Sequence, residues 1–552
     1  MAEQAFWYSE LEPRASQEAA IIDEAFRRRG IDIDGAADLA EDDRDVHPDG
    51  IAFMYAKDHI LTREQYLGGE GVIPGPRPPQ GSGKQRGVLD VLHDSHLAEI
   101  EVRRVVQDVM LVCLNPRRHK HPRDLGDDTP EGDDASADGG GIGEGDGGDA
   151  DGAKSNVLEL LAEMDAELGV GVATPDHVLT AAQTLRPCSA TEPVPPYPWA
   201  GPDPAICRDG GAKVRIFVAD TGLVKDAATT FPWLAGVRGR DDPRELPDGT
   251  IEPYGGHGTF VAGVLRAMAP EAQVYVADIF RTAGSALESE LVRRLNRAFR
   301  FGFEILHLTA ACMTRHNIPL LSLETWLERL RAYQGVVCVA PAGNFYTRRP
   351  SWPGAFPDVL SVGALAADRR HRADFSDYGS WVDVYAPGEN LINAYGSGRY
   401  TYQFEPDAPN VATFSGLAQW SGTSFSAPIV TGMIAARMAR CGESAREAAA
   451  VLLAKARSQT IPGVGPVLFP ECHGGDERCG RCGGDGGCGC GRCGCGEGYS
   501  GGRCGCGRCG RGEGYSGERC GCGRCGRGEG YSGGLWPWVA RACDALSGGS
   551  RH

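Results

Sequence analysis

Three side chains in the middle of the chain could together form a nucleophilic catalytic site. Asp220 ends the apolar stretch VRIFVAD, His257 lies between glycines in YGGHGT, and Ser424 lies in WSGTSFSAPIV, where a loop leads into an apolar helix. A serine hydroxyl becomes a strong nucleophile when a histidine takes its proton and a carboxylate fixes the tautomer and stabilises the charge of that histidine. These residue types therefore predict acyl-transfer chemistry.

The region from Lys213 to about Phe469 must supply the elements that position these side chains. Short apolar runs of strand length alternate there with helical stretches, which is typical of a mostly parallel sheet with helices on both faces. Asp220 lies at the carboxyl end of one such run, and functional groups of open α/β sheets gather at that edge. The amino end of a helix, where Ser424 is expected, favours a developing negative charge.

The motifs DTG, GGHGT and GTSFSAP follow one another in the order Asp, His, Ser and resemble those of the subtilisin-like serine proteases, the subtilases. The resemblance covers about 250 residues, from Lys213 to Phe469. It implies an α/β fold of the subtilisin type and serine endopeptidase activity. It also implies that Ser424 is the nucleophile, His257 the general base and then acid, and Asp220 the orienting anion, with no cofactor needed.

The same resemblance assigns residues to the oxyanion hole and to the substrate cleft. VVCVAPAGNF is similar to the family's oxyanion strand and loop, which makes Asn344 a side-chain donor and places Gly343 in the cleft. TAAC and TAGS correspond to the two cleft edges that would pair with an extended peptide substrate. They supply Thr309, Ala310, Ala311, Thr282, Ala283 and Gly284. Because Ala311 and Cys312 replace two glycines of the family pattern, we expect a narrowed primary pocket.

The chain before the peptidase region resembles a propeptide in one segment. LGVGVATPDHVL is similar to the end of the family's inhibitory propeptide, which implies intramolecular inhibition and a processing junction within Thr184–Asp209. An unrelated small α+β domain is the alternative. A helical stretch near Ser16–Arg29 is also expected. The expected domains are an N-terminal extension (1–84), a propeptide-like α+β domain (85–185) with an acidic Gly-rich insertion (124–153), a Pro-rich linker (186–212) and the peptidase (213–469).

A Gly- and Cys-rich repeat of period 16 occupies residues 470–534, with Tyr499, Tyr515 and Tyr531 marking the register. Three interpretations are open: a disulfide-paired module similar to epidermal growth factor, a metal-binding segment, and a flexible repeat without a fixed fold. The third is favoured, because the full six-cysteine spacing and paired CxxC knuckles are both missing. Residues 535–552 regain helix-like apolar spacing.

Composition and charge narrow the expected partners. The 552 residues carry a formal net charge of -18, which argues against a nucleic-acid partner. No apolar stretch reaches membrane-spanning length, so no membrane partner is expected. The first residues lack the pattern of a secretory signal peptide, which predicts a cytoplasmic location, although the cysteine-dense tail leaves export open.

The expected partner is a polypeptide substrate, and no metal ion is expected. The chain runs directly from VAGVL to APEAQVYVADI, without the longer loop that holds calcium in secreted members of the family. A different function, that of a catalytically silent peptide-binding or scaffold protein on the same fold, is the alternative. The filled catalytic positions favour the enzyme.

Overall fold

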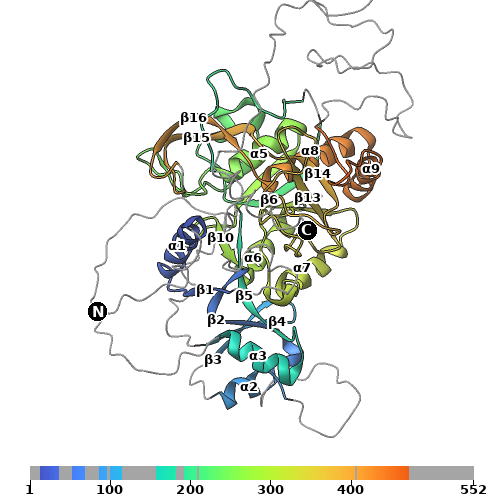
Figure 1. The fold of residues 1–552 in the computed structure, drawn as a ribbon. Helices are drawn as coiled ribbons and strands as arrows, with labels where there is room; N and C mark the ends of the chain where they lie inside the picture. Colours follow the sequence, from blue (N-terminus) through green and yellow to red (C-terminus); the bar gives the residue numbers. More distant parts are fainter. Residues whose placement is uncertain are drawn as a thin grey trace, which may run out of the picture.

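The computed structural model describes residues 13–36, 52–68, 86–95, 100–114, 157–181, 192–207, 210–404 and 407–470. These residues form a smaller α+β unit and a larger α/β unit, drawn in the lower and upper parts of Figure 1. The predicted insertion, the repeats and the segment 535–552 lie outside the described residues. None of the described helices is long and apolar enough to span a membrane.

A seven-stranded parallel sheet forms the centre of the larger unit, as the alternating pattern predicts. Its spatial order is β14 (Val384–Pro387), β13 (Val359–Leu365), β12 (Val337–Pro341), β11 (Ile305–Leu308), β6 (Arg215–Asp220), β9 (Gln273–Asp278) and β7 (Arg238–Gly239). Because every pair of neighbours is parallel, all the carboxyl ends lie at one edge. Asp220 ends the central strand β6, and Thr309 directly follows its neighbour β11.

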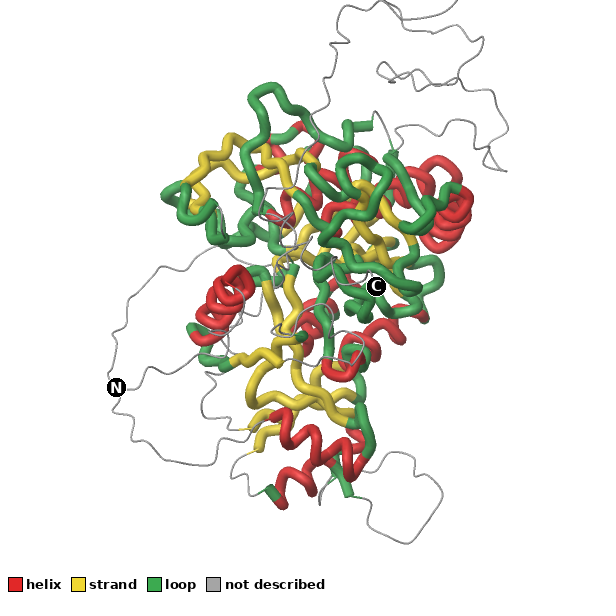
Figure 2. The backbone as a smooth tube through the Cα atoms, in the orientation of Figure 1, coloured by secondary structure: helices red, strands yellow, loops and turns green. Residues whose placement is uncertain are grey.

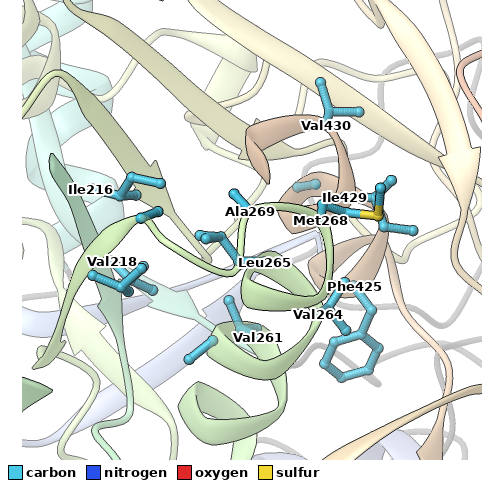
Figure 3. Close-up of a cluster of buried hydrophobic side chains, with 14 of the residues drawn as sticks. Ile216, Val218, Val261, Val264, Leu265, Met268, Ala269, Phe425, Ile429 and Val430 are labelled. Atoms are coloured by element: carbon cyan, nitrogen blue, oxygen red, sulfur yellow. The ribbon is translucent and has the colours of Figure 1, made fainter. Parts of the chain in front are cut away.

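Helices cover both faces of this sheet, and successive residues of β6 show why. Ile216 and Val218 belong to one buried cluster, whereas Phe217 and Ala219 belong to another on the opposite face. Figure 3 shows Ile216 and Val218 beside side chains of the helix α5 (His257–Met268), with side chains of the helix α8 (Thr423–Cys441) on the other side of α5. The opposite face is covered by α6 (Glu288–Leu295) and α7 (Leu321–Arg331). The remaining helices of the unit are α4 (Ala227–Thr230) and α9 (Ala445–Ser458).

The smaller unit is a sheet with its own helices and its own apolar core. Its order is β10-β5-β2-β4-β3, with β1 paired to β2. The bounds are β1 (Ile33–Ala36), β2 (Phe53–Arg63), β3 (Ile100–Val106), β4 (Val109–Leu114), β5 (Ala173–Thr180), α1 (Pro13–Arg27), α2 (Val88–Asp94) and α3 (Val157–Leu168), with β10 (Ser285–Leu287) contributed by the larger unit. The helices α2 and α3 cover one face, and the other packs on α6 and α7.

This sheet corrects the predicted domain boundary at residues 84 and 85. The strand β2, which falls in the expected N-terminal extension, lies between β4 and β5 of the same sheet. The α+β unit therefore includes residues well before position 85. The predicted helix near Ser16–Arg29 is confirmed as α1.

A long hairpin of β15 (Leu391–Thr401) and β16 (Val411–Trp420), with β8 (Thr250–Ile251) at its edge, completes the larger unit. The Pro-rich segment expected as a linker crosses this hairpin. Val194 forms a bridge with Gln419, and the carboxylate of Glu192 accepts a hydrogen bond of 2.7 Å from the Tyr400 hydroxyl. The described part of the segment is therefore docked on the larger unit.

Candidate functional site

Asp220 and His257 meet at the carboxyl edge of the parallel sheet. The His257 Nδ1 atom lies 2.8 Å from Asp220 Oδ1, and both side chains are fully buried. Asp220 Oδ1 also accepts a hydrogen bond of 2.7 Å from the Thr221 N–H. Burial raises the pKa of Asp220, but His257, Thr309 and Thr221 outweigh it and hold the pKa below its ordinary value. Asp220 is therefore held as an anion against the imidazole.

Two glycines allow the histidine to approach the aspartate so closely. Gly256 caps α5 with φ of +78°, a left-handed conformation that suits glycine. A Cβ atom on Gly258 would lie 2.3 Å from the Gly222 carbonyl oxygen, so any larger residue would push α5 away from the strand that carries Asp220. The GGHGT pattern thus has a steric reason in this fold.

Ser424 lies in the first turn of α8, and its hydroxyl is engaged by the N-terminal unit. The Oγ atom donates a hydrogen bond of 3.0 Å to the backbone carbonyl of Ala181, which directly follows β5. His257 Nε2 is buried and has no hydrogen-bond partner within the described part of the chain. The three side chains converge on one edge, but Ser424 is bonded to the N-terminal unit and not to His257.

Asn344 lies beside Ser424 with its side-chain amide in a fixed orientation. Its Oδ1 atom accepts hydrogen bonds from Thr423 N at 2.9 Å and from Thr423 Oγ1 at 2.8 Å. These two donors identify the oxygen end, which leaves Nδ2 as the donor end of the amide. The predicted cleft residue Gly343, with φ of +114°, donates its own N–H to Thr423 Oγ1 at 3.2 Å. Sequence reasoning did not find Thr423, although it directly precedes the predicted nucleophile.

The end of β5 lies in the cleft between two polypeptide edges. On one side Ala181 N donates to the Gly284 carbonyl at 2.9 Å, and β5 pairs antiparallel with β10. On the other side Ala311 N donates to the Thr180 carbonyl at 3.1 Å. A peptide held by main-chain hydrogen bonds on both sides occupies the cleft as an added strand. Figures 1 and 2 show β5 running from the smaller unit toward the larger one.

The residues predicted for the two cleft edges do not all face the bound strand. Gly284 and Ala311 contact it through the backbone, as described above. Thr309 instead supports the aspartate. Its hydroxyl donates a hydrogen bond of 2.5 Å to Asp220 Oδ2, and the same oxygen lies 2.8 Å from the Ala219 carbonyl oxygen. The Ala310 side chain is buried in the core. Thr282 and Ala283 precede β10 and contact the N-terminal segment.

The predicted processing junction within Thr184–Asp209 does not match the position of Ser424. Ala181, three residues before that range, is the residue whose carbonyl contacts Ser424 Oγ. The contact that the structure shows with Ser424 is therefore the hydrogen bond from its Oγ atom to the Ala181 carbonyl. Sequence spacing alone could not reveal it, because it depends on where the cleft meets a distant strand.

A pair of buried carboxylates lies where β5 meets α6. Asp176 accepts hydrogen bonds from Ser289 N at 3.0 Å and Ser289 Oγ at 2.6 Å. Glu288 accepts from the N–H groups of Ser322 and Leu323, and its Oε2 atom is buried without a hydrogen-bond partner among the described residues. Burial, together with the charge of Asp176, raises the pKa of Glu288 to about 8.

The raised pKa of Glu288 makes the folded chain less stable at alkaline pH. The folded chain keeps the Glu288 proton up to about pH 8, whereas the unfolded chain releases it near its ordinary value of 4.5, so stability falls as pH rises between these values. At pH 8.5 the free energy of unfolding of Glu288→Gln should therefore exceed that of the parent by about 1 kcal/mol or more, and the variant should unfold at a higher temperature. This advantage should shrink at pH 5. Thermal unfolding of Ser424→Ala chains measures it. Glu328→Gln, on an exposed position of α7, is the control; an equal gap at both pH values contradicts the argument.

Comparison with known proteins finds relatives of the larger unit. The subtilase family model matches residues 211–471. The chain is 28% identical over 237 residues to the intracellular serine protease of Paenibacillus polymyxa, covering 41% of this chain and 66% of that protein. It is 30% identical over 248 residues to the thermophilic serine proteinase of Bacillus sp. (strain AK1), covering 41% and 52%. The chain thus spans between half and two thirds of the length of these relatives.

Solved structures give matches of the same kind. The patellamide maturation protease PatA is 28% identical, with a TM-score of 0.36, over 45% of this chain and 88% of that one. The prenylagaramide maturation protease PagA is 25% identical, with a TM-score of 0.35, over 45% and 85%. The matched segment contains Asp220, His257, Asn344 and Ser424. Residues 211–471 therefore match the subtilase family of subtilisin-like serine proteases.

Proposed function

We propose that the protein is a serine endopeptidase that is made with its own N-terminal unit bound in the cleft as an inhibitor. The observation that carries this proposal is the strand β5, which pairs with both cleft edges and ends with the Ala181 carbonyl on Ser424 Oγ. The Ser424 hydroxyl donates a hydrogen bond to a peptide carbonyl. Asp220 holds the imidazole of His257, which would take the hydroxyl proton. The match of residues 211–471 to the subtilase family supports the same activity.

The proposed mechanism uses four groups. When a substrate replaces the N-terminal unit, His257 Nε2 takes the proton of Ser424 Oγ as the oxygen attacks the carbonyl carbon of the scissile bond. Asn344 Nδ2 and the Ser424 N–H stabilise the resulting oxyanion. The protonated His257 then gives its proton to the leaving amine, and the C–N bond breaks to leave an acyl-enzyme. Water, deprotonated by His257, hydrolyses the ester and restores Ser424. Asp220 stabilises the imidazolium in both halves.

The strand in the cleft also indicates which peptides would bind. Val178, Leu179, Thr180 and Ala181 are all buried, and the two of them nearest Ser424, Thr180 and Ala181, have small side chains. We therefore expect extended peptides with small residues at the two positions nearest Ser424 and apolar residues at the two before them. The same contacts would make the N-terminal unit a competitor of substrate. This proposed intramolecular inhibition agrees with the propeptide resemblance of LGVGVATPDHVL.

Labelling with a fluorophosphonate probe tests the proposed activity. The probe forms a covalent bond only with an activated serine, so the processed protein should be labelled and Ser424→Ala should not. The alternative, a silent peptide-binding protein on the same fold, predicts no labelling of either. Labelling that persists in Ser424→Ala would place the nucleophile elsewhere.

Asn344→Ala tests the proposed oxyanion hole. Removing the Nδ2 donor should lower kcat by about 10²–10³, the loss known for one such donor in a subtilisin, while KM changes little. Steady-state kinetics on a peptide ester measures both constants. Because Asn344 Oδ1 is held by Thr423, the variant Asn344→Asp keeps these hydrogen bonds but loses the donor, and it should be similarly slow. Activity of either variant within threefold of the parent would contradict the assignment.

A further inference from the structure

The first described segment, residues 13–36, contacts the larger unit directly, apart from the strand in the cleft. The helix α1 and the strand β1 contribute to a buried apolar cluster that contains residues of three parts of the chain. The members are Ala19, Ile22, Phe26, Ile31 and Ile33 of the segment, Met54, Ala56 and Val178 of the α+β sheet, and Leu287, Met313 and Phe345 of the larger unit. This cluster is separate from the core under α2 and α3. The segment is thus a second point of attachment.

Polar contacts add specificity to this attachment. The Arg29 guanidinium donates a hydrogen bond of 2.6 Å to Thr282 Oγ1 and forms an ion pair with both carboxylate oxygens of Glu290. The Tyr254 hydroxyl donates 3.2 Å to the buried carboxylate of Glu18. Glu290 is nearly buried, so its pairing with Arg29 is largely shielded from water.

The partners of the segment flank the site on both sides. Tyr254 lies three residues before His257, and Thr282 precedes the edge strand β10. On the opposite edge Phe345 directly follows Asn344. The apolar cluster of the segment therefore contains residues from both sides of the bound strand, together with Val178 of that strand. Figure 1 shows α1 beside β10, between the smaller and the larger unit.

The packing under α1 is incomplete. A cavity of about 500 Å³ lies between the helix and the cleft wall, and its lining includes Ile21, Glu24, Arg29, Arg281 and Ala283. A contact that combines an apolar cluster with paired charges and a half-open pocket is less tightly packed than a core. Such a contact can detach as a unit while the two folds that it joins stay intact.

We propose that residues 13–36 form a clamp that holds the cleft strand in place, and that Tyr254, Thr282, Leu287, Glu290, Met313 and Phe345 are its docking surface on the peptidase. This inference rests on the proposed function and extends it. Two contacts hold the N-terminal unit on the peptidase, the strand β5 in the cleft and the clamp above it, and both must break before the unit is released. Cutting the chain near Ser424 frees only the end of the strand, so release of the N-terminal unit waits for the clamp to detach.

Arg29→Ala in the full-length protein tests the clamp. It removes the bonds to Glu290 and Thr282 and should shorten the delay between self-cleavage and the appearance of peptidase activity at least fivefold. Because Arg29 leaves with the N-terminal unit, the final kcat/KM should equal that of the parent. Arg28→Ala is the matched control: this neighbouring arginine is exposed, and among the described residues its ion pair is with Glu24 of the adjoining helix α1. A delay equal to that of the parent in Arg29→Ala would overturn the proposal.

A second measurement separates failure of the clamp from failure of the proposed activity. In a Ser424→Ala background, amide hydrogen exchange should rise at least tenfold in β5 when Arg29→Ala is added, while α3 and β11 keep their protection. This outcome supports the clamp even if the chain never cleaves itself. Unchanged exchange in β5 contradicts it. If β11 also loses protection, the variant is misfolded, and Ile22→Ala, which weakens only the apolar part of the contact, is measured in its place.

Discussion

Replacing Ser424 with alanine is expected to leave the full-length chain uncut and to reduce peptidase activity by about 10⁶. The physical reason is that, among the described residues, Ser424 supplies the hydroxyl that contacts the Ala181 carbonyl, at 3.0 Å. Without the oxygen no acyl-enzyme can form, and the N-terminal unit stays attached in the cleft. Gel electrophoresis after incubation, followed by a peptidase assay, measures both effects.

Ser426→Ala is the matched control for this experiment. Ser426 is two residues further along α8, and its buried hydroxyl has no hydrogen-bond partner within the described residues. Its removal should leave self-cleavage and kcat close to those of the parent. Self-cleavage of Ser424→Ala at the parent's rate would contradict the assignment of the nucleophile.

Asp220→Asn is expected to lower kcat by about 10⁴ with little change in KM. The amide is nearly isosteric with the carboxylate, so the contacts with Thr221 and Thr309 can persist in part. It cannot, however, stabilise the imidazolium of His257 as an anion does, because the negative charge is gone. Steady-state kinetics on a peptide ester measures the loss.

The pH profile and a control sharpen the test of Asp220. At high pH hydroxide can replace the weakened base, so the residual activity of Asp220→Asn should rise with pH more steeply than that of the parent. Asp226→Asn, an exposed residue with φ of +59° that asparagine tolerates, should be unchanged. A loss below tenfold would show that the buried carboxylate is not needed to orient the histidine.

The larger unit follows closely from the sequence. Alternating apolar runs and helical stretches predict a parallel sheet covered on both faces, and Ile216 and Phe217 do face opposite cores. The motif residues Asp220 and His257 are adjacent because a strand end and a helix start meet at one edge. These features depend on local pattern and on the geometry of parallel sheets, which the sequence carries directly.

Contacts between distant segments could not be predicted in the same way. β2 joins β5 although the two are more than a hundred residues apart, so composition gave no sign of a shared sheet. The position of Ala181 on Ser424 and the docking of α1 on the cleft depend on the relative placement of two folded units. The role of Thr309 was also missed, because its motif suggests a cleft wall, while its side chain turns toward Asp220.

The N-terminal sequence of the self-cleaved protein tests the central claim most directly. The claim is that Ala181, directly after β5, binds at Ser424 in the same way as a substrate residue would. It predicts that the mature protein begins at Ala182, because the carbonyl that contacts Ser424 Oγ belongs to the bond between Ala181 and Ala182. The Ser424→Ala chain should give no new N-terminus. A mature protein that begins within 183–209, or a cut before Ala182 that persists in Ser424→Ala, would contradict the account.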